Sequence, residues 1–229
     1  MNEVYQFLYK GGPVMIPIML LSVIALAIFL ERMWTLRRST IAPEDIVEKV
    51  IGLLKAGKNE EAIFFCQANP SPLSKVLLTI IGNESASPEE ILELAEETGK
   101  REAGSIGKYI EALGTIATVE PLLGLLGTVT GLIRAFQQVV YYAGEGAVDP
   151  GRLASGIWEA LITTAAGLII GIPCYIGYKY IASRADFLVS KIEEGGTTVF
   201  HFIKYRNREI PLNNLSNKNT PENTSGNNQ

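Results

Sequence analysis

The sequence predicts an all-α, polytopic membrane protein with three transmembrane helices and a cytoplasmic helical domain. Three long apolar runs, a charged fraction of only 19% and a mean hydropathy of +0.19 support this fold class. A soluble domain of similar size carries about 25% charged residues, so the deficit indicates burial in lipid.

Composition argues against several functional classes. The net charge of -4 provides no basic face for nucleic acid. Two cysteines argue against a disulfide scaffold or a cysteine-based zinc site, and the single His201 leaves no conventional triad or histidine-rich metal cluster. We therefore expect no enzyme, no cofactor and no metal.

The first apolar run, 13–30, is uncharged and ends at Glu31 and Arg32. About 20 apolar residues cross a bilayer, so we assign a transmembrane helix to 13–34 after an N-terminal segment at 1–12. A cleaved signal peptide is the alternative. It would need a basic start, a shorter apolar core and small residues after it, and this run has none of these.

Two further spans are assigned to 112–142 and 153–182, joined by a short loop at 143–152. Basic residues cluster after the first and third spans, and such residues stay on the cytoplasmic side. We therefore expect the N-terminus and the loop outside, and the segment 35–111 and the C-terminal part in the cytoplasm.

The cytoplasmic segment reads as several helices. Pro43 and the acids after it start one helix, which Gly57 ends. Asn59 is expected to cap a second helix that runs as far as Cys66, and residues 73–81 are expected to form another.

Ser87 and Glu90 form a capping-box pattern that opens a longer helix. No proline interrupts this helix before Pro121, so we expect it to continue directly into the second span. Beyond the third span we expect a helical extension at 183–210. A disordered tail should follow at 211–229, which is rich in Asn, Ser, Thr and Pro.

Polar groups inside the spans are the functional candidates. Glu159 lies within the third span, where a central charge costs about 2.5 to 3.5 kcal/mol, so it should face protein or a wet cavity. Thr163 is four residues on and shares its face, and Thr164 lies on an adjacent face. Glycines crowd both spans and predict close helix packing: Gly124, Gly127, Gly131, Gly167 and Gly171.

Structural alternatives remain for these polar residues. Hydroxyls such as those of Thr128 and Thr164 also bond to the backbone of their own helix. Arg134 fits an interfacial anchor better than a pore residue. Close packing does not require a carboxylate, so Glu159 is the residue that packing explains least well.

The segment from Leu113 to Phe136, with Glu-Pro-Leu-Leu-Gly-Leu-Leu-Gly-Thr at 120–128, resembles the second-span signature of the MotA/TolQ/ExbB proton channel family. The segment from Gly156 to Pro173 resembles the third-span signature. Three spans and a large cytoplasmic segment favour the ExbB/TolQ-like branch over the MotA branch, which typically has four spans.

This resemblance implies a proton-channel subunit of a motor in the bacterial inner membrane, with a periplasmic N-terminus. It implies a homo-oligomeric ring, a pentamer, around an ExbD/TolR-like single-span protein with a transmembrane Asp. A TonB/TolA-like energy transducer would carry force to the outer membrane.

Residue by residue, Thr128 and Thr164 match the family's threonines that face the partner's Asp, and Glu159 matches its third-span acid. Pro121 and Pro173 match prolines that let the spans bend. The family usually has a small residue where this chain has Glu120. That carboxylate either extends the proton path or lies at the membrane–water interface, and the interface is slightly favoured.

The rival hypothesis is a non-conducting membrane scaffold that organises a multiprotein envelope complex. Glu159 would then be a structural group paired with Arg134 or with a partner. An enzyme is a distant third possibility, because no histidine lies within a span and one subunit provides no paired carboxylates.

Overall fold

The computed structural model describes residues 11–37, 41–43, 45–142 and 150–216. These residues form helices and the turns between them, with no strand in the described ranges. Three helical stretches there are long and apolar enough to cross a membrane, which confirms the predicted all-α class with three candidate spans. Most of the predicted N-terminal segment at 1–12, most of the loop at 143–152 and the end of the tail fall outside the described residues.

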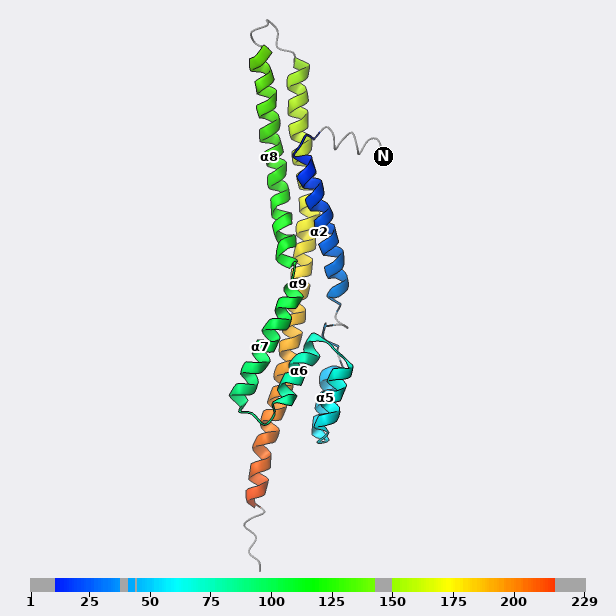
Figure 1. The fold of residues 1–229 in the computed structure, drawn as a ribbon, viewed down its shortest axis with the longest axis vertical. Helices are drawn as coiled ribbons and strands as arrows, with labels where there is room; N and C mark the ends of the chain where they lie inside the picture. Colours follow the sequence, from blue (N-terminus) through cyan, green and yellow to red (C-terminus); the bar gives the residue numbers. More distant parts are fainter. Residues whose placement is uncertain (1–10, 38–40, 44, 143–149, 217–229) are drawn as a thin grey trace, which may run out of the picture. The chain divides into compact units, whose positions relative to one another are not determined.

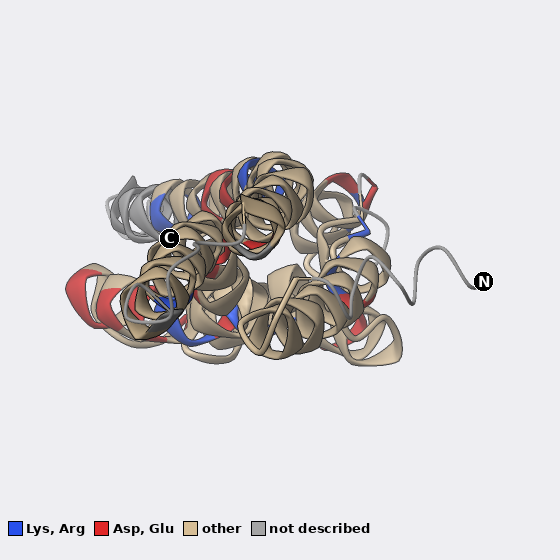
Figure 2. Ribbon diagram, turned by 90° about the horizontal axis from the view of Figure 1, so that it is seen from above, with Lys and Arg blue, Asp and Glu red and all other residues tan. Residues whose placement is uncertain are grey.

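Two compact units make up the chain. The membrane unit contains α2 (Met15–Thr35), α8 (Ile110–Tyr142) and α9 (Pro150–Ser216) as far as Asp186. The peripheral unit contains α4 to α7 and the rest of α9 from Phe187. Charged positions occupy only short stretches of the ribbon, most of which is uncharged (Figure 2).

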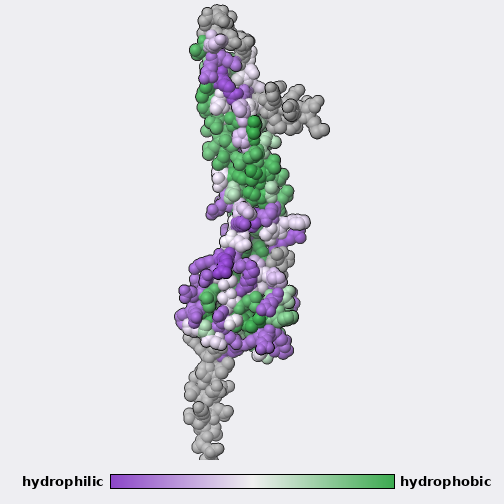
Figure 3. Space-filling model, viewed as in Figure 1, coloured by the Kyte–Doolittle hydropathy of each residue, from purple (hydrophilic) through white to green (hydrophobic). Residues whose placement is uncertain are grey.

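In the membrane unit, α8 and α9 run side by side in opposite directions, with α2 against them (Figure 1). Met15 at the start of α2 packs on Ile162 and Ala166 of α9. Ala25, the middle residue of α2, packs on Leu113 and Ile116 of α8. Large apolar side chains such as those of Ile16, Leu20 and Val23 remain exposed, and Figure 3 shows the hydrophobic surface that results. This surface is suited to lipid or to other membrane helices.

The contact between α8 and α9, here called the seam, is built from small residues. Gly131 lies against Ala160, where an added Cβ would be 2.9 Å from the alanine Cβ. The other packing glycines predicted from sequence also lie at the seam: Gly124 and Gly127 against Thr164 and Thr163, Gly167 against the Glu120 carbonyl, and Gly171 against the Pro121 ring. Glycine allows the two backbones to approach this closely.

Both prolines lie within unbroken helices. Pro121 is inside α8, and Pro173 is inside α9. A proline inside a helix removes one backbone hydrogen bond and favours a bend.

The expectation of one helix from Ser87 through the second span was wrong. Two residues separate the end of α7 (Pro88–Gly107) from the start of α8, because Tyr109 adopts a left-handed conformation with φ of 63°. The Tyr109 ring lies 5.4 Å from the Arg32 guanidinium and 4.8 Å from the Lys108 ammonium. Cation–π contacts of this kind help to hold an otherwise unfavourable backbone.

The peripheral unit begins with α4 (Ile46–Lys55), α5 (Asn59–Ala68) and α6 (Pro72–Gly82). Gly57 follows α4 with φ of 72°, a conformation that glycine adopts readily. Asn59 does not cap α5 as expected. Instead it is the first helical residue, and its side chain donates to Glu84 at 2.6 Å and accepts from Arg206 at 3.0 Å.

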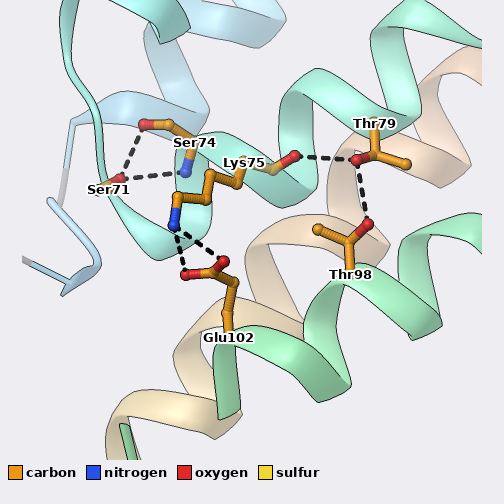
Figure 4. A network of polar contacts seen from close by, with 6 residues as sticks. All are labelled: Ser71, Ser74, Lys75, Thr79, Thr98 and Glu102. Atoms are coloured by element: carbon orange, nitrogen blue, oxygen red, sulfur yellow. Dashed lines mark hydrogen bonds and ion pairs between the residues drawn. The ribbon is translucent and has the colours of Figure 1, made fainter. Parts of the chain in front are cut away.

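Serines start the next two helices. The Ser71 hydroxyl accepts from the backbone N–H of Ser74 at 3.0 Å, and Ser87 accepts from the N–H of Glu90 at 3.2 Å, which confirms Ser87 as an N-cap. Between α6 and α7, the Lys75 ammonium bonds to the Glu102 carboxylate at 2.9 Å, and the Thr79 and Thr98 hydroxyls are 3.2 Å apart (Figure 4).

The core of the peripheral unit is aliphatic and fully buried. It includes Val50, Leu54, Leu77, Ile80, Leu188, Val199 and Ile203. α9 contributes to it beyond Phe187 and continues to Ser216, so residues 211–216 are helical rather than part of the predicted disordered tail.

Candidate functional site

An ion pair joins the second and third apolar helices. The Arg134 guanidinium on α8 lies 2.7 Å from the Glu159 carboxylate on α9, with side chains 42% and 24% exposed. Partial exposure leaves room for water or a neighbouring subunit beside the pair. This is the Arg134–Glu159 pairing that the scaffold hypothesis named.

The chain just before α2 closes over this pair. Gly12 has φ of 68°, and a Cβ there would collide with Glu159 Oε1 and lie 3.4 Å from an Arg134 nitrogen. Only glycine both adopts this positive φ readily and leaves room for so close a contact with the ion pair. No local sequence pattern connects Gly11 and Gly12 with the third span.

Thr163 is fully buried, one turn after Glu159 along α9. Its hydroxyl lies 2.8 Å from the Glu159 carbonyl and 3.0 Å from the Gly11 carbonyl. A hydroxyl has one proton, so it donates to one of these oxygens at a time. This residue therefore connects α9 to the segment that leads into α2.

Thr164 crosses the seam, whereas Thr128 does not. The Thr164 hydroxyl donates to the Gly124 carbonyl of α8 at 2.9 Å, and the Thr128 hydroxyl donates to the Leu125 carbonyl of its own helix at 2.6 Å. The backbone-bonded alternative thus describes Thr128 but not Thr164. The oxygen of each of these two hydroxyls keeps lone pairs that can accept a hydrogen bond from a further donor.

Glu120 lies inside the seam. Its side chain has no exposed surface, and both carboxylate oxygens lack a hydrogen-bond partner among the residues that the structure describes. It is one turn beyond Ile116, which packs on the middle of α2, so it lies within the length that α2 covers. The choice between the proton path and the membrane–water interface for Glu120 stays a prediction.

Together these groups form a polar line through apolar surroundings. From the loop end of α8 and α9 inward it contains the Arg134–Glu159 pair, Thr163, the Thr164–Gly124 bond and Glu120. No three His, Cys, Asp or Glu side chains converge as metal ligands within the described part of the chain.

Sequence reasoning placed Glu159 and the threonines on the correct helices but did not predict the full line. Arg134 and Glu159 lie at similar distances along the chain from the loop between α8 and α9. In an antiparallel pair, equal distances bring residues to one level, so this spacing supports the Arg134–Glu159 pair that the scaffold hypothesis named.

A family model described as the MotA/TolQ/ExbB proton channel family matches residues 60–194, which include every group in the polar line. The putative biopolymer transport protein ExbB-like 1 of Synechocystis sp. is 36% identical over 179 residues, covering 76% of this chain and 68% of the relative.

Two other relatives show the same likeness over different lengths. The putative biopolymer transport protein ExbB-like 3 of Synechocystis sp. is 30% identical over 162 residues, covering 71% of this chain and 77% of the relative. The Tol-Pal system protein TolQ of Haemophilus influenzae is 37% identical over 86 residues, covering 38% of this chain and 36% of the relative.

Proposed function

The chain belongs to the MotA/TolQ/ExbB proton channel family, and from that premise we propose that it is the proton-channel subunit of an ExbB-ExbD-like or TolQ-TolR-like motor complex. The family consists of membrane channel and transport subunits rather than enzymes. Its relatives carry the names ExbB and TolQ, and three apolar helices make this chain a membrane component of the same kind.

The polar line along the seam is the observation that carries the proposal. Hydroxyls and an ion pair lie between helices whose outer faces are apolar, as with Leu125, Phe136 and Ile169. Proton movement through a membrane needs groups that accept and donate hydrogen bonds at depths where lipid supplies none. Thr163, Thr164 and Glu159 provide such groups.

In the proposed mechanism, a pentamer of this chain surrounds a single-span ExbD/TolR-like partner that carries a transmembrane Asp. Thr128 and Thr164 solvate that carboxylate and hold water beside it, while Glu159 sets the local field and relays protons. One charge that crosses the membrane yields about 2.3 kcal/mol per 100 mV, which bounds the electrical work per proton.

The proposed setting is the bacterial inner membrane, with the N-terminus periplasmic and the C-terminus cytoplasmic. Force would pass to the outer membrane through a TonB/TolA-like transducer. The excess of Lys and Arg after the first and third spans supports this orientation.

The test is proton flux into vesicles that contain this chain together with the small single-span protein that co-purifies with it. Thr164→Val removes the hydroxyl that crosses the seam and should abolish flux while the complex still assembles. Thr118→Val is the matched control, because the Thr118 hydroxyl is exposed on α8 and bonds to its own helix. Wild-type flux in Thr164→Val would contradict the pore assignment.

A specific observation also favours the scaffold as a second candidate, since the Arg134–Glu159 pair is the contact that a structural role predicts. Exchanging the two charges separates the hypotheses. For a structural pair, the double variant Arg134→Glu with Glu159→Arg should restore the function that each single variant loses. For a proton relay, the exchanged pair should assemble but not conduct, because arginine does not release its proton.

A further inference from the structure

Glu120 is the group that the proposed mechanism leaves unused. Its carboxylate is fully buried, and neither oxygen has a hydrogen-bond donor among the described residues. Burial of an ionised carboxylate without partners is strongly unfavourable, and a buried polar group of this kind calls for an explanation.

The surroundings of Glu120 consist mainly of carbon. An added Cβ on Gly171 would lie 2.8 Å from the Pro121 ring and 3.3 Å from the Glu120 Cβ, and one on Gly167 would lie 2.7 Å from the Glu120 carbonyl oxygen. The helix backbones thus close over the side chain. Metal cations need several oxygen ligands, so this enclosure suits a proton better than a metal cation.

Few titratable groups face Glu120 among the residues that the structure describes. On α9 the titratable group that interacts with it electrostatically is the Cys174 thiol. The α2 residues packed near Cys174 are apolar: Leu21, Ala25, Ile28 and Phe29. Because the chain's own helices cover Glu120 completely, a basic side chain of another subunit cannot reach it without separating them.

The depth of Glu120 follows from the contacts of α2. The α2 helix has 21 residues, which span about 31 Å. The contacts of its first residue with α9 define an outer level, and the contacts of its middle residue with α8 define a central level. Glu120 lies between these levels, about 6 Å from Ile116 along α8. Gly124, which accepts the Thr164 bond, is one turn further toward the outer level.

We propose that Glu120 is an intramembrane proton-binding site of this subunit, which holds a proton between α8 and α9 and exchanges it with the conducting path at Thr164. One carboxylate oxygen gains a proton and later releases it, and no other bond changes. The exchange rests on the proposed channel function, whereas the bound proton does not.

The bound proton can be tested on the purified full-length chain without its partner. A protonated carboxyl group gives an infrared carbonyl band that shifts on transfer to heavy water. We expect one such band in the wild type and in Glu111→Gln, whose carboxylate is exposed on the same helix, and its loss in Glu120→Gln. If the amide of the glutamine variant disturbs folding, Glu120→Met provides a second test. Its side chain has a similar volume, and it should lose the same band.

The exchange is tested by proton flux in the complex with the single-span partner. Glu120→Gln should slow flux by about tenfold, and Glu111→Gln should leave it unchanged. Absence of the band from the wild type, or its persistence in both Glu120 variants, would overturn the proton site even if the wild type conducts. Unchanged flux in Glu120→Gln would overturn the exchange. A wild type that shows the band but conducts no protons would instead contradict the proposed channel.

Discussion

The two units of the molecule bury their helices in different ways. Across the seam of the membrane unit, glycine and alanine bring backbone against backbone, as where Gly167 meets the Glu120 carbonyl. In the peripheral unit, large aliphatic side chains fill the core, and even the close neighbours of Gly195 are side-chain tips of Leu73 and Val47.

This difference reflects the solvent around each unit. Water drives large apolar side chains together, so a unit in water gains stability from the area that it buries. Lipid provides no such force between helices, and close van der Waals contact replaces it. Substitutions that change side-chain volume should therefore act differently in the two units.

The largest effect is expected in the aliphatic core. Leu77→Ala removes a side chain with no exposed surface on α6 and should lower the free energy of unfolding of the peripheral unit by about 2 to 5 kcal/mol. Thermal unfolding of the full chain in detergent measures the loss. Phe64→Ala on α5 is the control, because that ring is 71% exposed and its removal should change stability by less than about 0.5 kcal/mol.

Alkaline pH should also weaken the peripheral unit. Burial raises the pKa of the Cys66 thiol from 9.0 to about 11, so the folded state binds this proton more tightly than the unfolded state. The associated stability is present below pH 9 and is lost as the pH rises toward 11, by about 2 to 3 kcal/mol.

The difference between wild type and Cys66→Ala, measured by denaturant unfolding at pH 8 and pH 11, isolates this contribution from other titrating groups. The same loss with and without Cys66 would mean that its thiol is not the cause.

An added methyl group should disrupt the seam. Gly167→Ala would place a Cβ 2.7 Å from a backbone oxygen and 3.0 Å from the Gly124 Cα, and neither atom can rotate away. We expect α8 and α9 to separate at a cost of about 1 to 3 kcal/mol. Thermal unfolding of the full chain in detergent measures this loss of stability.

The smallest effect has the opposite sign and sharpens the comparison. Gly52→Ala adds the same methyl group to α4, where nothing lies within 4 Å, and should stabilise the peripheral unit by about 0.5 to 1 kcal/mol. Thermal unfolding in the same detergent provides the measurement. If Gly52→Ala and Gly167→Ala stabilised their units equally, helix propensity rather than close contact would govern both sites.

Sequence patterns predicted the helices better than the places where they break. Ser87 was correctly predicted as an N-cap, because its hydroxyl acts on the next turn of the chain. The break at Tyr109 was missed, since no proline marks it and its left-handed backbone lies beside the distant Arg32. Asn59 was misread for a similar reason: its side chain bonds to Glu84 and Arg206, far along the chain.

The sequence by itself determined the all-α class, the three apolar helices and the family signature at 113–136 and 156–173, because hydropathy and local motifs depend on neighbours in the chain. Only the tertiary structure decided that Arg134 meets Glu159, that Thr164 bonds across to Gly124, and that Glu120 is enclosed without a partner. These contacts depend on the register of two antiparallel helices, which packing sets and which no single helix encodes.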